Sequence, residues 1–242
     1  MWDRSLLSSL GAQSAPRSYW HCRGSVHIAA LLFLVGAVLV ACVAASAGPA
    51  PDQVVRIVAL GDSLTAGLGL PADATFPAKL EAALKANGLS VNIINAGVSG
   101  DTAARGLARL DWSVPEGTDA VIVELGANDM LMGVDPKVTR NALTEIVRRL
   151  TGRGIAVLLA GMRAAPNLGA DYGRGFESIY SELAAEYDVL IYPFFLDGVA
   201  ADARLNQVDG IHPTAAGVDQ IVMRMLPRVE ELVAQVRRRR PT

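Results

Sequence analysis

The chain has 242 residues, of which 51% are hydrophobic and 19% are charged, and its formal net charge is −2 at pH 7. This composition supplies a large hydrophobic core, and the near-neutral charge balance argues against a nucleic-acid partner. Both cysteines, Cys22 and Cys42, fall within the first 47 residues, so the rest of the chain has neither a disulfide nor a thiolate metal site.

Residues 1–47 have the pattern of an export signal. Three arginines and one aspartate precede residue 28, and residues 28–47 then form a stretch of 20 residues without a charge. A basic segment ahead of an apolar stretch that ends in small residues, here Ala45-Ser46-Ala47, is typical of a cleaved secretory leader. We therefore expect an exported protein, periplasmic or secreted, whose mature body is residues 48–242.

Two alternatives to a freely cleaved leader stay open. Twenty apolar residues are long enough to span a bilayer, so residues 28–47 could remain as a membrane anchor. The segment Leu39-Val40-Ala41-Cys42 resembles a bacterial lipobox, in which the cysteine is lipidated and begins the mature protein. Cys42 could equally be one more apolar residue of the leader. The sequence does not distinguish the soluble, lipidated and anchored forms, and it does not indicate the oligomeric state.

From residue 54 onward, short apolar runs alternate with amphipathic stretches. The runs are rich in Val and Ile and too continuous for half-exposed strands, which favours a parallel sheet covered on both faces. Strands are predicted at residues 54–60, 91–96, 120–125, 155–160 and 189–194. Helices are predicted at residues 76–86, 102–110, 136–150, 176–187 and 214–236. This alternation predicts a single doubly wound α/β domain with a five-stranded parallel sheet.

Polar segments follow the predicted strands at the edge where open α/β sheets bind their ligands. Gly61-Asp62-Ser63-Leu64 follows the first strand and places Ser63 at a helix N-terminus, where its N–H points toward a developing oxyanion. Val98-Ser99-Gly100-Asp101 follows the second strand, and Gly100 lets the backbone approach a ligand closely. The N–H of Gly100 is therefore a candidate second oxyanion donor.

Two further segments supply an amide and an imidazole. Asn128 follows the third strand, and its side-chain NH₂ is a neutral donor suited to an oxyanion. Near the C-terminus, the segment Asp209-Gly210-Ile211-His212-Pro213 can fold the carboxylate of Asp209 back onto the imidazole Nδ1–H of His212. Such a contact fixes the tautomer of the ring and stabilises the imidazolium formed during catalysis.

Each of these segments alone is an ordinary turn or helix cap, but together they supply every role that acyl transfer requires. A serine hydroxyl needs an imidazole to take its proton, and His212 is the only histidine after the leader. We therefore predict Ser63, Asp209 and His212 as catalytic residues. The N–H groups of Ser63 and Gly100 and the amide of Asn128 are the predicted oxyanion donors.

These residues resemble the four sequence blocks of the GDSL esterase family, also called SGNH hydrolases after their Ser, Gly, Asn and His. Ser63, Gly100, Asn128 and His212 stand at the matching positions, and Asp209 fits the family's Asp-x-x-His arrangement. The resemblance spans residues 56–226 and is strongest to the bacterial periplasmic thioesterase, lysophospholipase and arylesterase branch. It implies a flavodoxin-like three-layer α/β/α fold and a serine mechanism that uses neither a metal nor another cofactor.

One departure from the family pattern is Ala127, where relatives often have glycine. A methyl group there can alter the loop geometry without touching the donor at Asn128.

We therefore expect a serine esterase that hydrolyses small-molecule carboxylic esters or thioesters through an acyl-enzyme. A carbohydrate O-deacetylase with the same residues, or a non-catalytic envelope binding protein, are the alternatives. Acyl selectivity is expected in the loops at residues 130–134 and 162–175, and the glycines and proline of the second loop suit a mobile flap. Leu168 and Tyr172 in this loop are candidate substrate-binding residues.

Overall fold

The computed structural model describes residues 53–240. The expected leader at residues 1–47, with its apolar stretch and Cys42, lies outside this part of the chain. Within residues 53–240, no helix combines the length and the apolar character that a membrane span requires.

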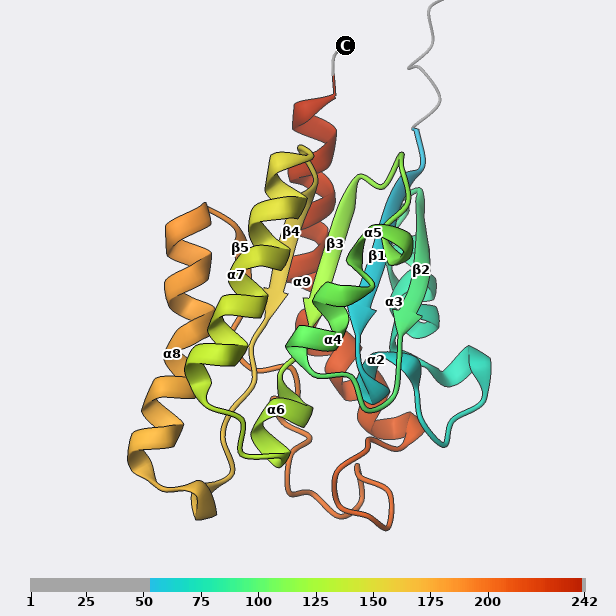
Figure 1. Cartoon of the computed structure of the whole chain (residues 1–242). Helices are drawn as coiled ribbons and strands as arrows, with labels where there is room; N and C mark the ends of the chain where they lie inside the picture. The colour runs from blue at the N-terminus through green and yellow to red at the C-terminus, as the bar shows by residue number, and fades with distance from the viewer. Residues whose placement is uncertain (1–52, 241–242) are drawn as a thin grey trace, which may run out of the picture. The chain divides into compact units, whose positions relative to one another are not determined.

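A parallel five-stranded sheet forms the centre of the fold, with the strand order β2-β1-β3-β4-β5 (Figure 1). The strands are β1 (Val55–Gly61), β2 (Val91–Gly97), β3 (Ala120–Glu124), β4 (Ala156–Ala160) and β5 (Leu190–Tyr192). This is the order of flavodoxin-like sheets, in which the order reverses between β1 and β3. The predicted fold class is confirmed.

Helices cover both faces of the sheet, which explains why the central strands β3 and β4 are almost entirely apolar. In Figure 1, α3 (Phe76–Ala86) and α9 (Ala215–Arg239) lie against one face. The opposite face carries α4 (Ala103–Ala108), α7 (Pro136–Gly152) and α8 (Ala170–Tyr187). Every residue of β3 and β4 is buried, so the middle of the sheet is the middle of the core.

Short helices occupy the loops between these elements. They are α2 (Ser63–Ala66), α5 (Leu110–Ser113) and α6 (Ala127–Leu131), with single 3-10 turns at Ala72–Ala74 and Pro166–Leu168. At the carboxyl edge of the sheet, side chains cap the helices that begin there: Asp62 accepts from a backbone N–H of α2, Thr102 from α4 and Thr214 from α9. These caps fix the direction in which each helix leaves its loop.

The helix predicted at residues 176–187 begins earlier, at Ala170. The ring of Tyr172 stacks on that of Phe176 one turn later, with centroids 5.9 Å apart, and Phe176 is fully buried. This packing outweighs the low helix propensity of Gly173 and Gly175. The loop expected to form a flap is therefore shorter, because residues 170–175 belong to α8.

Two other boundaries differ from the prediction. The helix predicted at residues 102–110 is divided into α4 and α5 at Arg109. The last strand ends at Tyr192, because Pro193 has no N–H with which to continue the sheet.

The end of β2 packs closely against α2, and this contact requires glycine. A Cβ on Gly97 would lie 2.2 Å from the backbone nitrogen of Ala66. We expect Gly97→Ala to lower the free energy of unfolding by about 2 kcal/mol or more, because the backbone of Ala66 must shift. Gly152→Ala at the end of α7 is the matched control, since nothing lies within 4 Å of its new Cβ. Urea unfolding measures both variants, and equal stability of the two would show that the contact between β2 and α2 tolerates a side chain.

Candidate active site

Ser63 lies at the carboxyl edge of the sheet, directly after β1. It is the first residue of α2 and is 8% exposed. Close packing forces this sharp strand-to-helix turn, because a Cβ on Gly61 would lie 2.1 Å from Thr65 Oγ1 and 2.5 Å from Glu124 Oε2. The hydroxyl of Ser63 is thus held at the wall of a cavity by a turn that has little freedom to relax.

The structure brings Ser63, His212 and Asp209 together. His212 Nε2 lies 2.8 Å from Ser63 Oγ, although the two residues are 149 positions apart in the sequence. On the other side of the ring, His212 Nδ1 lies 2.7 Å from Asp209 Oδ2. With an ionised Asp209 accepting from Nδ1–H, the lone pair of Nε2 faces the serine hydroxyl, as proton abstraction requires.

The carboxylate of Asp209 is held by the backbone as well as by the ring. Its Oδ1 accepts from the N–H groups of Ile211 at 2.9 Å and of His212 at 3.0 Å. These backbone bonds and the imidazole contact lower the pKa of Asp209 to about 2. The tight loop requires a φ of +72° at Gly210, a left-handed conformation that glycine adopts without steric strain. Asp209 therefore stays ionised over the whole pH range in which a histidine base is neutral.

The predicted oxyanion donors lie around the same cavity. Ser63, Gly100 and Asn128 all line it, and Gly100 has a φ of +84° with no atom within 4 Å of the position that a Cβ would take. Among the described residues, neither the Ser63 nor the Gly100 N–H is paired with a backbone or side-chain acceptor. These two donors are directed by the turn and the loop rather than by another hydrogen bond.

Asn128 differs from the other donors because its amide already has partners. Asn128 Nδ2 donates to Asp62 Oδ2 and to the backbone oxygen of Asp101, both at 3.0 Å. The sequence predicts an amide available to a substrate, whereas the structure has both of its hydrogens directed at protein acceptors. A substrate oxygen must therefore share one of these hydrogens or replace one of the two acceptors.

Two buried carboxyl groups lie beside the turn between β1 and α2. Asp62 and Glu124 are fully buried, and Glu124 Oε2 accepts from Thr65 Oγ1 at 2.7 Å and from the N–H of Asp62 at 3.3 Å. Burial raises the pKa of Asp62 to about 6 and that of Glu124 well above its usual range. Asp62 Oδ1 also accepts from the N–H of Leu64 at 2.9 Å, so Asp62 links the start of α2 to the amide of Asn128.

The cavity beside Ser63 and His212 has a volume of about 560 Å³. Its lining is mostly apolar and includes Leu68, Met130, Phe194 and Ala200. A space of this size and character suits an acyl chain. Within residues 53–240, no three His, Cys, Asp or Glu side chains are grouped so that they could hold a metal ion.

The two candidate substrate-binding residues lie outside this cavity. Residues 162–166 of the loop after β4 do line it, but Leu168 and Tyr172 do not. Tyr172 instead donates its hydroxyl to the backbone oxygen of Val134 at 2.9 Å. The earlier start of α8 explains the position of Tyr172, which belongs to a packed helix and not to a flap. Leu168 ends the 3-10 turn that precedes α8.

Sequence reasoning also missed Arg109, a buried arginine whose side chain reaches the loops that carry the oxyanion donors. Its signal in the sequence is weak: a single basic residue within Gly106-Leu107-Ala108-Arg109-Leu110 is equally compatible with an exposed helix end. Only the contacts in the folded chain distinguish the two.

Comparisons with known proteins identify the family. The model of the GDSL-like lipase/acylhydrolase family matches residues 59–220. Esterase TesA of Pseudomonas aeruginosa is 35% identical over 178 residues, which cover 73% of this chain and 89% of the relative. An arylesterase of Vibrio mimicus is 39% identical over 159 residues, which cover 65% of this chain and 80% of the relative.

Solved structures give the same result. AlinE4, an esterase described as a member of the SGNH-hydrolase family, has 46% identity and a TM-score of 0.64, and the match covers 75% of this chain and 98% of AlinE4. The crystal structure of TesA has 35% identity and a TM-score of 0.70, with 73% of this chain and 99% of TesA covered.

The raised pKa of Asp62 predicts how stability changes with pH. Because the folded pKa of about 6 exceeds the ordinary 3.8, the folded state binds the proton more tightly, and acidification through this window stabilises it. We expect the free energy of unfolding of the wild type, relative to Asp62→Asn, to rise by on the order of 1 kcal/mol or more between pH 7.5 and pH 4.5.

Urea unfolding at the two pH values measures this difference. Asp73→Asn, which removes an exposed carboxylate, is the control. A constant difference for Asp62→Asn would show that Asp62 ionises normally in the folded protein.

Proposed function

Since this chain belongs to the GDSL-like lipase/acylhydrolase family and is a serine ester hydrolase, we propose that it cleaves small acyl esters or thioesters with Ser63 as the nucleophile. The observation that carries the proposal is the contact of 2.8 Å between Ser63 Oγ and His212 Nε2 at the wall of an apolar cavity. This contact supports the roles of Ser63 as nucleophile and His212 as base, beside a space that suits an acyl group.

In the proposed mechanism, Ser63 Oγ attacks the carbonyl carbon of the substrate while His212 Nε2 takes the hydroxyl proton. Asp209, 2.7 Å from His212 Nδ1, stabilises the imidazolium that forms. The carbonyl oxygen becomes an oxyanion, which accepts hydrogen bonds from the N–H groups of Ser63 and Gly100 and from the Asn128 amide.

Collapse of the tetrahedral intermediate breaks the bond to the leaving group. His212 Nε2 donates its proton to the departing oxygen or sulfur, and the acyl group stays on Ser63 Oγ. Water then repeats the sequence: His212 takes a proton from it, the hydroxide attacks the acyl carbon, and the proton returns to Ser63 as the acid leaves. Every proton in the cycle thus passes through a single imidazole nitrogen.

The apolar lining of the cavity favours an acyl chain over the acetyl group of a carbohydrate. We propose simple acyl esters and thioesters as the substrate class on this basis. Hydrolysis of aryl esters and acyl thioesters by residues 48–242, without comparable hydrolysis of acetylated sugars, is the expected result. The reverse preference would identify an O-deacetylase instead.

We also propose that residues 1–47 direct export, so that the enzyme acts outside the cytoplasm. The basic segment, the apolar stretch and the small residues at its end support this. Mass analysis of the mature protein distinguishes cleavage after Ala47 from lipidation at Cys42 and from an uncleaved anchor.

The proposed roles predict two different sizes of effect. Ser63→Ala and His212→Ala should each lower kcat by about 10⁶-fold, whereas Asn128→Ala should lower it by on the order of 10²- to 10³-fold, because two oxyanion donors remain. Hydrolysis of a p-nitrophenyl ester measures these rates. A fluorophosphonate probe should label Asn128→Ala but not Ser63→Ala. Labelling of Ser63→Ala, or near-wild-type rates in all three variants, would refute the assignment. A wild type that neither hydrolyses the ester nor reacts with the probe would favour a non-catalytic binding protein.

The cavity predicts where acyl-chain length is set. Ala200 is exposed and lines the cavity, so Ala200→Phe should fill part of it without disturbing the core. Each methylene excluded forfeits about 0.8 kcal/mol, so the loss of two methylenes lowers kcat/KM for long-chain esters by roughly tenfold while short-chain esters are unaffected. Leu168→Phe, outside the lining, is the control. An unchanged profile for Ala200→Phe, or an equal shift in the control, would place the acyl chain elsewhere.

A further inference from the structure

Arg109 is a buried arginine at the carboxyl edge of the sheet, where the chain passes from α4 to α5. It is 8% exposed, and its side chain makes four hydrogen bonds within the protein. They run from Nε to Asp101 Oδ2 at 2.5 Å, from Nη1 to the backbone oxygen of Ala96 at 2.8 Å and to Ser113 Oγ at 2.9 Å, and from Nη2 to the backbone oxygen of Gly61 at 2.8 Å. One guanidinium thus joins the carboxyl ends of β1 and β2 to the loop that follows β2.

Two of these partners, Gly61 and Asp101, lie close in the chain to a proposed oxyanion donor. Gly61 precedes the turn that directs the Ser63 N–H. Asp101 directly follows Gly100, so the ion pair restrains the loop that carries the Gly100 N–H. The backbone oxygen of Asp101 also accepts from Asn128 Nδ2 at 3.0 Å. The Ser63 and Gly100 N–H groups therefore belong to segments that the guanidinium bonds directly, at Gly61 and Asp101. The Asn128 amide is linked to it through Asp101.

We propose that Arg109 is a positioning residue that holds the three oxyanion donors in the arrangement needed to bind the transition state. The inference rests on the proposed function, because it concerns the same site. The planar guanidinium presents its donors in a fixed fork, so that Gly61, Ala96 and Asp101 keep one relative geometry. A lysine at this position would keep the charge but could not hold three acceptors in one plane.

The charge arrangement supports a positioning role rather than a general stabilising one. The side chains of Arg109 and Asp101 are each only 9% exposed. Burying such a pair has a desolvation cost that its mutual attraction often does no more than offset, so stability alone is a weak reason for a charged pair here. The charged pair fixes the geometry of the edge that binds the oxyanion. An apolar pair could not do this, because it has no directional hydrogen bonds.

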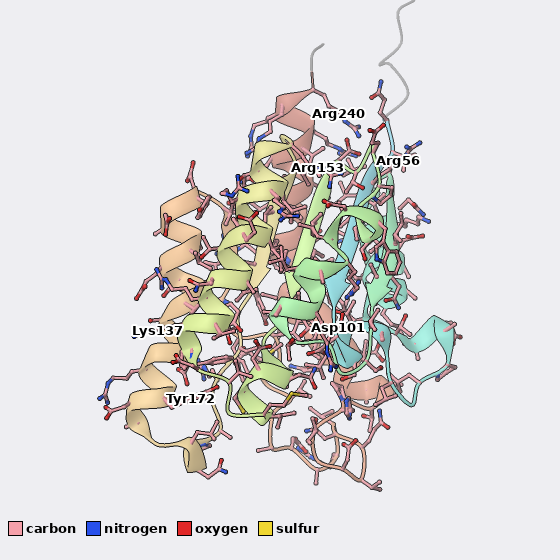
Figure 2. All side chains as sticks on the ribbon, in the orientation of Figure 1. Arg56, Asp101, Lys137, Arg153, Tyr172 and Arg240 are labelled. Carbon is pink, nitrogen blue, oxygen red and sulfur yellow. The ribbon has the colours of Figure 1, made fainter. Side chains whose placement is uncertain are left out.

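Arg240 provides a matched comparison at the other end of the sheet. Its guanidinium also clamps backbone oxygens, those of Gln53 and Val54, and pairs with Asp119 Oδ2 at 2.9 Å. Figure 2 shows Arg240 and Asp101 near opposite ends of the strands. Loss of this second clamp removes the same kinds of bond without touching the oxyanion donors.

The test compares Arg109→Lys with Arg240→Lys. The fraction of competent enzyme is counted by complete reaction with a fluorophosphonate, and kcat and KM for a p-nitrophenyl ester are expressed per labelled site. We expect Arg109→Lys to lower kcat per site by on the order of 10- to 100-fold with KM changed less than about threefold, because the donors act on the transition state. Arg240→Lys should keep the wild-type kcat per site even if it unfolds at a lower temperature.

A double-mutant cycle adds a readout that a purely structural role would not move. If Arg109 acts through the oxyanion donors, Asn128→Ala should cost much less in the Arg109→Lys background than in the wild type. Asp101→Asn, which keeps Arg109 and the shape of its partner, should give a smaller loss of kcat per site. This variant also serves the test if Arg109→Lys does not fold.

Wild-type kcat per labelled site in Arg109→Lys, or in Asp101→Asn where Arg109→Lys does not fold, would overturn the positioning role whatever the effect on stability. So would fully additive losses in the double-mutant cycle. Failure of the proposed function is a separate result: it would appear as hydrolysis that persists in Ser63→Ala.

Discussion

The parallel register of the strands is the constraint on which the candidate site depends. Because β1, β2 and β3 run in the same direction, the residues that follow them, Ser63, Gly100 and Asn128, come to one edge of the sheet. The imidazole of His212 reaches the same edge from a loop just before α9. Neither a change in strand order nor an antiparallel pairing would leave these groups around one cavity.

Near this edge, the chain buries five ionisable side chains. Asp62, Asp101, Arg109, Glu124 and Asp129 are all at most 8% exposed. Each makes hydrogen bonds to neighbouring loops, helices or strand ends, as buried polar groups generally do. Burial disfavours the ionised form of a carboxyl. This effect raises the pKa of Asp62 and that of Glu124, which lie beside the turn between β1 and α2. The polar network gives the loops one geometry in place of the looser packing that apolar side chains would allow.

The sequence is sufficient for the parts of this site that follow local rules. Ser63 and Gly100 follow strands that their Val- and Ile-rich runs predict, and His212 is the only histidine after residue 47 that could act as base. The predicted start of α8 is wrong because the glycines that suggest a flexible loop are overridden by the i, i+4 contact of Tyr172 with Phe176 and by the burial of Phe176 in the core. Arg109 is hidden for a different reason, since its acceptors at Gly61 and Ala96 lie outside the local sequence.

The occupied amide of Asn128 shows why such a site is built from linked residues rather than isolated ones. An amide free to rotate would have to be oriented when the oxyanion forms, whereas Asp62 and the backbone of Asp101 fix its plane beforehand. The arrangement has a cost, because an ionised Asp62 competes with the oxyanion for one of the same hydrogens and repels it. A carboxyl whose pKa is raised by burial reduces that conflict, since its charge is easier to neutralise than that of an exposed aspartate. Orientation of the donor and easier protonation of the competing carboxyl are thus both consequences of burying Asp62 beside the turn.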